Sequence, residues 1–345
     1  MKKLLLIFFL LLFVALAYYY FYYHGQSFIS PLGKGSAKEK PLVVYTFENL
    51  RKTVFPKSNI TVGQQISETS DFITQMFYFS VSQTPKSTVM KKVSGVLNSP
   101  KKPGIYPVIV MFRGFVPQET YKPGIGTQPS AKVFAQHGFI TLAPDFLGYG
   151  ESADASKDSF EDRFKTYTTA LTLLSSLETL NSGLEASYSG TIKADMTKIG
   201  IWGHSNGGQI ALMALAITRA SYPTVLWAPV SKSFPYSILY YTDEFDDQGK
   251  SLRKALSRFE EDYGTEAFSP PNYYHWIKAP LQIHQGEADQ EVPLWWSDDL
   301  VATLKKDNID VKYLTYPGAD HNLLPSGWSS AVTSSIAFYD EYFNR

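Results

Sequence analysis

The amino-acid sequence predicts an α/β fold in which a mostly parallel sheet is covered by helices on both faces. Two observations support this prediction. From residue 90 onward, short apolar runs alternate with longer runs of helical periodicity, as in sheets whose strands are buried on both sides. The chain has 345 residues, 19% of them charged and 15% aromatic, which is the length and composition of a protein with a large core.

The first 25 residues are predicted to anchor the chain in a membrane. Residues 4–23 follow two lysines and carry no charge, and twenty helical residues span about 30 Å, the thickness of bilayer hydrocarbon. The lysines then stay in the cytoplasm and the tyrosines lie at the outer interface. A cleaved signal peptide is the alternative, because Ala15-Leu16-Ala17 fits a small-x-small cleavage site. We therefore expect an exported protein, with the rest of the chain anchored outside the cytoplasm or secreted.

Three further segments follow. Residues 26–41 are rich in Ser, Gly, Lys and Pro and are predicted to form a linker. Residues 42–89 contain β-branched and aromatic stretches, which predict a few strands and a helix packed on the main domain. This extension is too short for a β-propeller of several blades. Residues 90–345 are predicted to form the main α/β domain.

The main domain has a predicted order of elements. They are strands over 91–99 and 106–112, a helix over 129–138, a strand over 139–145, a helix over 159–180, a strand over 197–202, a helix over 207–220, a strand over 223–230, a polar and aromatic insert over 231–275, a strand over 279–285, a helix over 294–307, a strand over 310–318 and a helix over 331–343. In parallel sheets, the loops at the carboxyl ends of the strands line the ligand site.

Charge and cysteine content exclude several classes of function. Lys and Arg number 32, as do Asp and Glu, so no basic surface for nucleic acid is expected. The chain has no cysteine, which excludes disulfides, thiolate metal sites and a cysteine nucleophile. The acidic segment 240–250 lacks the spacing of a calcium-binding loop. We expect neither a metal nor an organic cofactor.

Ser205 is the predicted nucleophile. Residues 203–207 read Gly-His-Ser-Asn-Gly, between a strand-like run and an alanine-rich helical run. This is the context of a nucleophile elbow, a tight turn that exposes the serine hydroxyl. The glycines permit unusual backbone conformations and leave space around that hydroxyl. A serine that only caps a helix would not require glycine at both flanking positions.

A serine hydroxyl needs a base, and the base needs an acid that orients it. In this architecture, the acid and then the base follow the serine along the chain. His321 is the predicted base because it lies in the loop after the last strand. His284 lies inside a strand and His275 in the insert, where it could line a pocket. His204, next to the nucleophile, is expected to point away from the direction of attack.

Asp289 is the predicted acid, because it lies in the loop after the strand that precedes the histidine loop. Glu287, in the same loop, is the alternative. Asp320 is less suitable because a direct neighbour of His321 in sequence rarely faces it, and we expect it to stabilise the loop.

The oxyanion of an acyl-transfer reaction needs about two preorganised donors. The backbone N–H of Asn206, directly after the nucleophile, is the first predicted donor, and that of Phe115, after the strand over 106–112, is the second. The Arg113 side chain is expected either to bind a substrate carboxylate or to form a structural ion pair. Tyr149 and Trp295 belong to a group of aromatic residues expected near the substrate.

Three stretches of the main domain resemble the α/β-hydrolase superfamily, and within it the catalytic domain of the prolyl oligopeptidase family. They are "GHSNGG", "PDFLGYGES" at residues 144–152, and the tail from "SPPNYYHW" to "GADHNL" at residues 269–323. The resemblance extends over roughly residues 91–345. It implies an α/β-hydrolase fold and a Ser205–Asp289–His321 triad.

The chain also departs from the family's pattern. It has no room for the family's propeller, no pair of glutamates that would grip a free amine is evident, and "MFRGF" stands where the family has a tyrosine oxyanion donor. Dienelactone-hydrolase-like proteins and esterases share the core without the propeller. We therefore expect a serine peptidase for short peptides, with a carboxylesterase for small or carbohydrate-linked esters as the alternative. A tethered binding module without catalysis is a third possibility, which the complete set of candidate residues disfavours.

Overall fold

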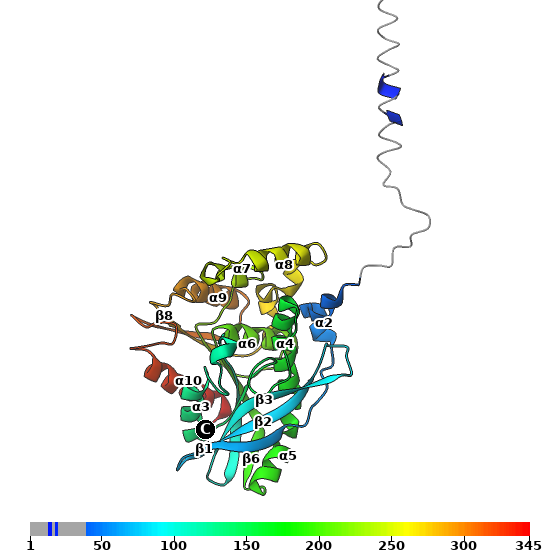
Figure 1. Cartoon of the computed structure of the whole chain (residues 1–345). Helices are drawn as coiled ribbons and strands as arrows, with labels where there is room; N and C mark the ends of the chain where they lie inside the picture. Colours follow the sequence, from blue (N-terminus) through cyan, green and yellow to red (C-terminus); the bar gives the residue numbers. More distant parts are fainter. Residues whose placement is uncertain (1–12, 16–17, 20–38) are drawn as a thin grey trace, which may run out of the picture. The chain divides into compact units, whose positions relative to one another are not determined.

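The computed structural model describes residues 13–15, 18–19 and 39–345, of which Leu42–Arg345 form one compact unit (Figure 1). The predicted membrane segment and linker lie almost entirely outside the described residues, so both stay predictions. Within the described residues, no helix combines the length and apolarity needed to cross a bilayer.

The compact unit is built on one sheet of nine strands, in the order β1-β2-β3-β5-β4-β6-β7-β8-β9. Strands β5, β4 and β6 to β9 are parallel to one another, and β1, β2 and β3 add an antiparallel edge. Two of these edge strands come from residues 42–89, which therefore extend the sheet. The strands are β1 (Thr61–Glu68), β2 (Phe72–Ser82), β3 (Met90–Pro100), β4 (Gly104–Phe112), β5 (Ile140–Pro144), β6 (Ile192–His204), β7 (Thr224–Trp227), β8 (Leu281–Gly286) and β9 (Val311–Tyr316).

Helices cover both faces of the sheet. Successive residues of β4 face opposite cores, since Val110 packs in the core with α4 and α6 and Met111 in the core with α3 and α10 (Figure 1). Burial on both sides explains why the parallel strands are continuous apolar runs in the sequence. The helices are α2 (Phe47–Lys52), α3 (Gln128–Gln136), α4 (Ser159–Ser176), α5 (Leu180–Tyr188), α6 (Asn206–Thr218), α7 (Tyr236–Leu239), α8 (Lys250–Glu260), α9 (Leu294–Lys306) and α10 (Trp328–Phe343).

Helix α6, which starts directly after the predicted nucleophile, is deeply buried. Every residue from Gly207 to Ile217 is buried. A helix that is apolar all round is enclosed on every side, and this accounts for the alanine-rich run in the sequence. Its first turn is therefore held in a fixed position under the site.

The insert over residues 231–275 is folded, although its polar composition predicted no regular element. Helix α8 forms because it is amphipathic, with Leu256 and Phe259 buried on one side. The Phe259 ring lies 5.1 Å from that of Phe160 and 6.2 Å from that of Phe164, both on α4. These aromatic contacts attach the insert to the main domain.

Candidate active site

Ser205 lies at the junction of β6 and α6 in a strained backbone conformation, with φ 56° and ψ −122°. Such a conformation costs a non-glycine residue about 1–3 kcal/mol and persists only where its surroundings impose it. Here the Ser205 N–H donates to the carbonyl of Trp227 at 2.9 Å, and the Ser205 carbonyl accepts from the N–H of Val230 at 3.0 Å. Strand β7 and the loop that follows it therefore hold the elbow in place.

The glycines around Ser205 are required by close packing and not by positive φ angles, which corrects the expectation from the sequence. A Cβ atom on Gly207 would overlap the carbonyl oxygen of Phe112 and lie 2.6 Å from that of Arg113. A Cβ atom on Gly203 would lie 2.6 Å from the Gly207 carbonyl oxygen. The positive φ falls on the serine itself. The glycines allow α6 to pack directly against the end of β4.

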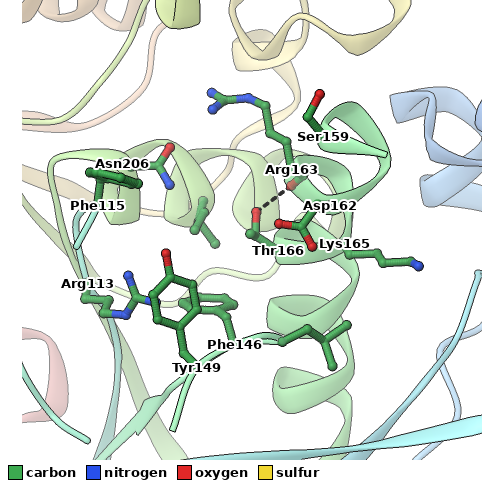
Figure 2. Close-up of a pocket in the computed structure, with 12 residues that line it drawn as sticks. Arg113, Phe115, Phe146, Tyr149, Ser159, Asp162, Arg163, Lys165, Thr166 and Asn206 are labelled. Atoms are coloured by element: carbon green, nitrogen blue, oxygen red, sulfur yellow. Dashed lines mark hydrogen bonds between the residues drawn. The ribbon is translucent and has the colours of Figure 1, made fainter. Parts of the chain in front are cut away.

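The loop that follows β4 passes directly beside the serine. A Cβ atom on Gly114 would lie 3.0 Å from the Ser205 Cβ and 3.5 Å from its Oγ. The next residue, Phe115, and Asn206 line the same cavity of about 180 Å³, shown in Figure 2. Within the described residues, neither of their backbone N–H groups donates to another protein atom. Asn206 is the first residue of α6, at the positive end of the helix, and Phe115 follows the glycine that packs against Ser205. Their role as oxyanion donors stays a prediction.

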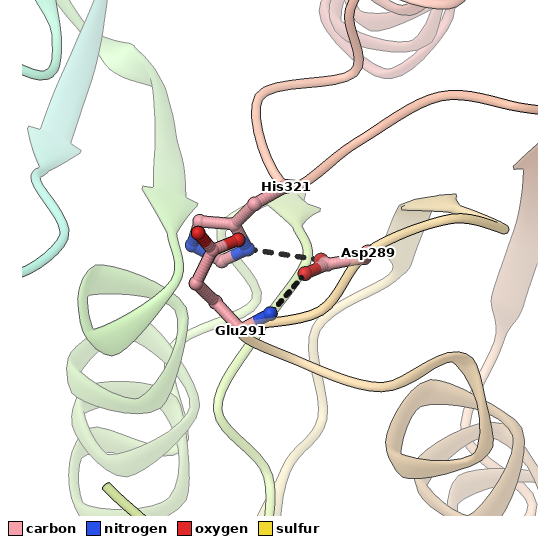
Figure 3. A group of neighbouring side chains, drawn as sticks. All are labelled: Asp289, Glu291 and His321. Atoms are coloured by element: carbon pink, nitrogen blue, oxygen red, sulfur yellow. Dashed lines mark hydrogen bonds and ion pairs between the residues drawn. The ribbon is translucent and has the colours of Figure 1, made fainter. Parts of the chain in front are cut away.

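His321 and Asp289 are brought together by the loops after β9 and β8. The His321 Nδ1 lies 2.9 Å from Asp289 Oδ2, as Figure 3 shows. The Asp289 side chain is 0% exposed. It accepts further hydrogen bonds from the Gln285 amide at 3.0 Å and from the N–H groups of Glu291 at 3.0 Å and Val292 at 2.8 Å. These bonds fix the carboxylate in the orientation that holds the imidazole.

The other acidic residues of these loops have different partners. Glu287 accepts a hydrogen bond from Thr315 at 2.9 Å, on the outer strand β9. Asp320 accepts from the N–H groups of Asn322 and Leu324 at 2.8 and 2.9 Å, which is the loop-stabilising role expected for it. Neither carboxylate has a hydrogen bond to His321 among the described residues.

An exposed carboxylate, that of Glu291, stands beside the imidazole (Figure 3). One ligand atom each from Asp289, Glu291 and His321 lie within 4.8 Å of one another. These three groups offer the donor set of a divalent cation. The exposed Glu291 also adds a negative charge beside the imidazole.

His204 has a role that the sequence did not reveal. Its Nε2 donates to the backbone carbonyl of His321 at 2.9 Å, and the two rings lie 4.6 Å apart. Burial, assisted by the neighbouring His321, lowers the pKa of His204 to about 4, so the ring is neutral at neutral pH. His204 thus connects the elbow to the histidine loop. No local sequence pattern signals such a contact.

His284 is a second buried histidine, and it is structural, in agreement with its position inside a strand. Its Nε2 donates to Gln282 Oε1 at 2.9 Å, and its Nδ1 accepts from the Tyr316 hydroxyl at 2.7 Å. Burial lowers the pKa of His284 to about 3.

We expect the free energy of unfolding to fall as the pH is lowered from about 6.5 to about 4. His204 and His284 are neutral in the folded chain, with pKa values of about 4 and about 3, and bind protons near pH 6.5 once unfolded. Their stabilising contribution is complete above pH 6.5. It decreases below that pH by up to about 1.4 kcal/mol per pH unit for each histidine.

Urea unfolding at a series of pH values measures this slope. Replacing His284 by glutamine (His284→Gln) removes one titrating group and should lower the slope by about 1.4 kcal/mol per pH unit. A slope that is the same in the variant would show that His284 is already protonated in the folded chain, contrary to its pKa of about 3.

The three predicted substrate-binding residues are placed differently from one another. Arg113 and Tyr149 line the cavity beside Phe115, but Trp295 is not among its lining residues in the described part of the chain (Figure 2). Trp295 is 47% exposed and packs against the ammonium of Lys232, 4.1 Å from its ring centroid. Arg113 is buried, and among the described residues its side-chain hydrogen bonds go to two backbone carbonyls and to no carboxylate.

Comparisons with known proteins bear on the family and the fold of the chain. The model of the prolyl oligopeptidase family matches residues 127–345. A curated relative, the dipeptidyl peptidase family member 6 of Caenorhabditis elegans, is 28% identical over 138 residues, which are 38% of this chain and 18% of the relative. The alignment thus covers less than a fifth of that protein's length.

Two solved structures resemble almost the whole chain. The acetyl xylan esterase from Paenibacillus sp. R4 has a TM-score of 0.55 at 16% identity and covers 86% of this chain and 92% of its own. Acetyl xylan esterase 1 from Thermoanaerobacterium sp. JW/SL YS485 has a TM-score of 0.55 at 17% identity, with 88% and 93% covered. At these identities the likeness concerns the fold, and it confirms the expected α/β-hydrolase fold.

Proposed function

The chain belongs to the prolyl oligopeptidase family and is a serine hydrolase, and we propose that it cleaves its substrate by acyl transfer to Ser205. The observation that carries this proposal is the strained Ser205 elbow, with φ 56°, whose neighbour His204 is bonded to the loop of His321. The hydrogen bond between the Asp289 carboxylate and Nδ1 of His321 supports the proposal that these two residues form a catalytic triad with Ser205.

The proposed reaction has two steps. His321 accepts the hydroxyl proton as Ser205 Oγ attacks the substrate carbonyl carbon, and the N–H groups of Asn206 and Phe115 hold the oxyanion. The bond to the leaving group breaks, and His321 gives it the proton. Water then attacks the acyl-enzyme, with His321 again as the base, which releases the acid and restores the serine. Asp289 keeps the proton of the free imidazole on Nδ1, so that Nε2 can accept.

For the substrate, we propose a short peptide or aminoacyl amide with a free amine. Family membership supports a peptide bond, and the exposed Glu291 carboxylate beside His321 suits a cationic group. The alternative is a small ester. The likeness of nearly the whole chain to two acetyl xylan esterases favours that alternative.

Measuring kcat/KM for alanyl- and prolyl-p-nitroanilide, for N-acetylalanyl-p-nitroanilide and for p-nitrophenyl butyrate separates the two. We expect turnover of the free amines, a loss on acetylation, and a higher KM for the free amines in Glu291→Gln. Kinetics of that variant on the uncharged ester serve as its control and should be unchanged. Turnover of the ester alone would instead identify a carboxylesterase.

A further inference from the structure

The peptide bond between Gly114 and Phe115 has a partner on each of its two sides. Its N–H belongs to Phe115, the proposed oxyanion donor, and its carbonyl oxygen accepts a hydrogen bond from Arg113 Nη1 at 2.9 Å. The bond is trans, so the carbonyl and the N–H point in opposite directions. The Arg113 guanidinium therefore lies on the side of the peptide opposite to the donor.

The Arg113 guanidinium is itself held in a fixed position. Arg113 is only 6% exposed, and its Nη2 donates to the backbone carbonyl of Asp145 at 3.0 Å, at the end of β5. The guanidinium carbon lies 4.1 Å from the ring centroid of Tyr149 and 4.7 Å from that of Tyr121, an arrangement visible in part in Figure 2. Arg113 thus packs against two aromatic rings and donates two charge-assisted hydrogen bonds at the same time. Arginine can do this with its flat guanidinium group, whereas lysine has a single ammonium group.

Tyr149 holds the same loop at a second point. Its hydroxyl donates to the carbonyl of Val116 at 2.9 Å. The carbonyl on each side of Phe115, that of Gly114 and that of Val116, is thus bound by a side chain packed beneath the loop. The Phe115 side chain is 75% exposed, so its own packing does not fix the backbone.

We propose, on the basis of the proposed function, that Arg113 is a positioning residue for the oxyanion. Its hydrogen bond to the Gly114 carbonyl orients the Gly114–Phe115 peptide so that the Phe115 N–H faces the developing negative charge. The bond also withdraws electron density from the carbonyl, which makes the N–H of the same peptide a stronger donor. Tyr149 completes the support by fixing the Val116 carbonyl.

Three variants of the full chain test this role. Arg113→Met removes both charged donors, Arg113→Lys keeps the charge with a single donor group, and Tyr149→Phe keeps the ring without the hydroxyl. The control is Arg345→Met, because Arg345 also stacks on a ring, Phe139 at 4.4 Å, and donates to two carbonyls, those of His137 and Gly138. It makes the same kinds of contact just beyond the end of α10, together with an ion pair to Asp340 at 3.5 Å.

The readouts are kcat, KM, the melting temperature and the inhibition constant of a peptidyl trifluoromethyl ketone, which forms a tetrahedral oxyanion with the serine. Arg113→Met should lower kcat by about 10²-fold with KM nearly unchanged, and it should raise the inhibition constant of the ketone by a similar factor. Arg113→Lys should recover part of the loss in kcat and part of the loss in ketone affinity. Tyr149→Phe should lower kcat and the ketone affinity by about tenfold each. Arg345→Met should change neither.

Two results would overturn the inference. A rise in KM alone would make Arg113 a substrate ligand, and a lower melting temperature with unchanged kcat and ketone affinity would make it structural only. If Arg113→Met does not fold, Arg113→Lys and Tyr149→Phe decide the question. A fluorophosphonate that labels the wild type at Ser205 supports the proposed function independently, whereas no labelling and no turnover would remove both proposals.

Discussion

Replacement of the nucleophile, Ser205→Ala, is expected to lower kcat by about 10⁶-fold and to abolish fluorophosphonate labelling. The alanine has no atom that can form the acyl-enzyme, so only binding and the oxyanion donors remain. The fold should be retained, because the elbow is held by the backbone bonds of residue 205 to Trp227 and Val230, which alanine also forms.

Full progress curves with a p-nitrophenyl ester or anilide, together with thermal unfolding, measure both effects. Ser175→Ala on α4 is the control, because its hydroxyl bonds, in the described part of the chain, only the Thr172 carbonyl of its own helix, at 2.9 Å. The control should keep full activity. Retention of more than about a tenth of kcat in Ser205→Ala would show that another residue is the nucleophile.

The candidate triad was accessible from the sequence because each member belongs to a local pattern. Ser205 follows from glycines between a strand and a helix, and Asp289 and His321 follow from their loops after consecutive strands of a parallel sheet. Chain order alone then assigns the roles. The alternation of apolar and helical runs likewise predicted the sheet, because strands buried on both faces leave a continuous apolar signal.

Other features depend on contacts between distant segments and had no local signal. His204 supports a carbonyl 117 residues away, and Arg113 reaches the backbone of Asp145, 32 residues away. Helix α8 was missed because its polar composition conceals a buried side that pairs with α4. The expectation that the glycines adopt unusual backbone conformations was wrong, because neither Gly203 nor Gly207 has a positive φ. Their need for close packing appears only once β4 lies against α6.

Asp289→Asn is expected to lower kcat by about 10⁴-fold with little change in KM. The two backbone N–H groups of Glu291 and Val292 both bond Asp289 Oδ1, so the amide oxygen of asparagine takes that position. The new NH₂ group then faces His321 Nδ1, where Oδ2 was. It donates to Nδ1 and drives the proton to Nε2, the tautomer that cannot accept the proton of the serine hydroxyl.

Steady-state kinetics on the p-nitrophenyl ester measure the loss, with two neighbouring carboxylates as matched controls. Glu287→Gln removes the acid that sequence alone left as the alternative, and Glu291→Gln removes the exposed charge beside the imidazole. Both should keep kcat on the uncharged ester within a few-fold, because the Glu287 carboxylate bonds Thr315 and it is the backbone N–H of Glu291 that bonds Asp289. A large loss of kcat in Glu287→Gln, together with an active Asp289→Asn variant, would show that Glu287 is the acid that orients the histidine. Since the Asp289 carboxylate is the one that bonds Nδ1 among the described residues, the tautomer argument requires the opposite result.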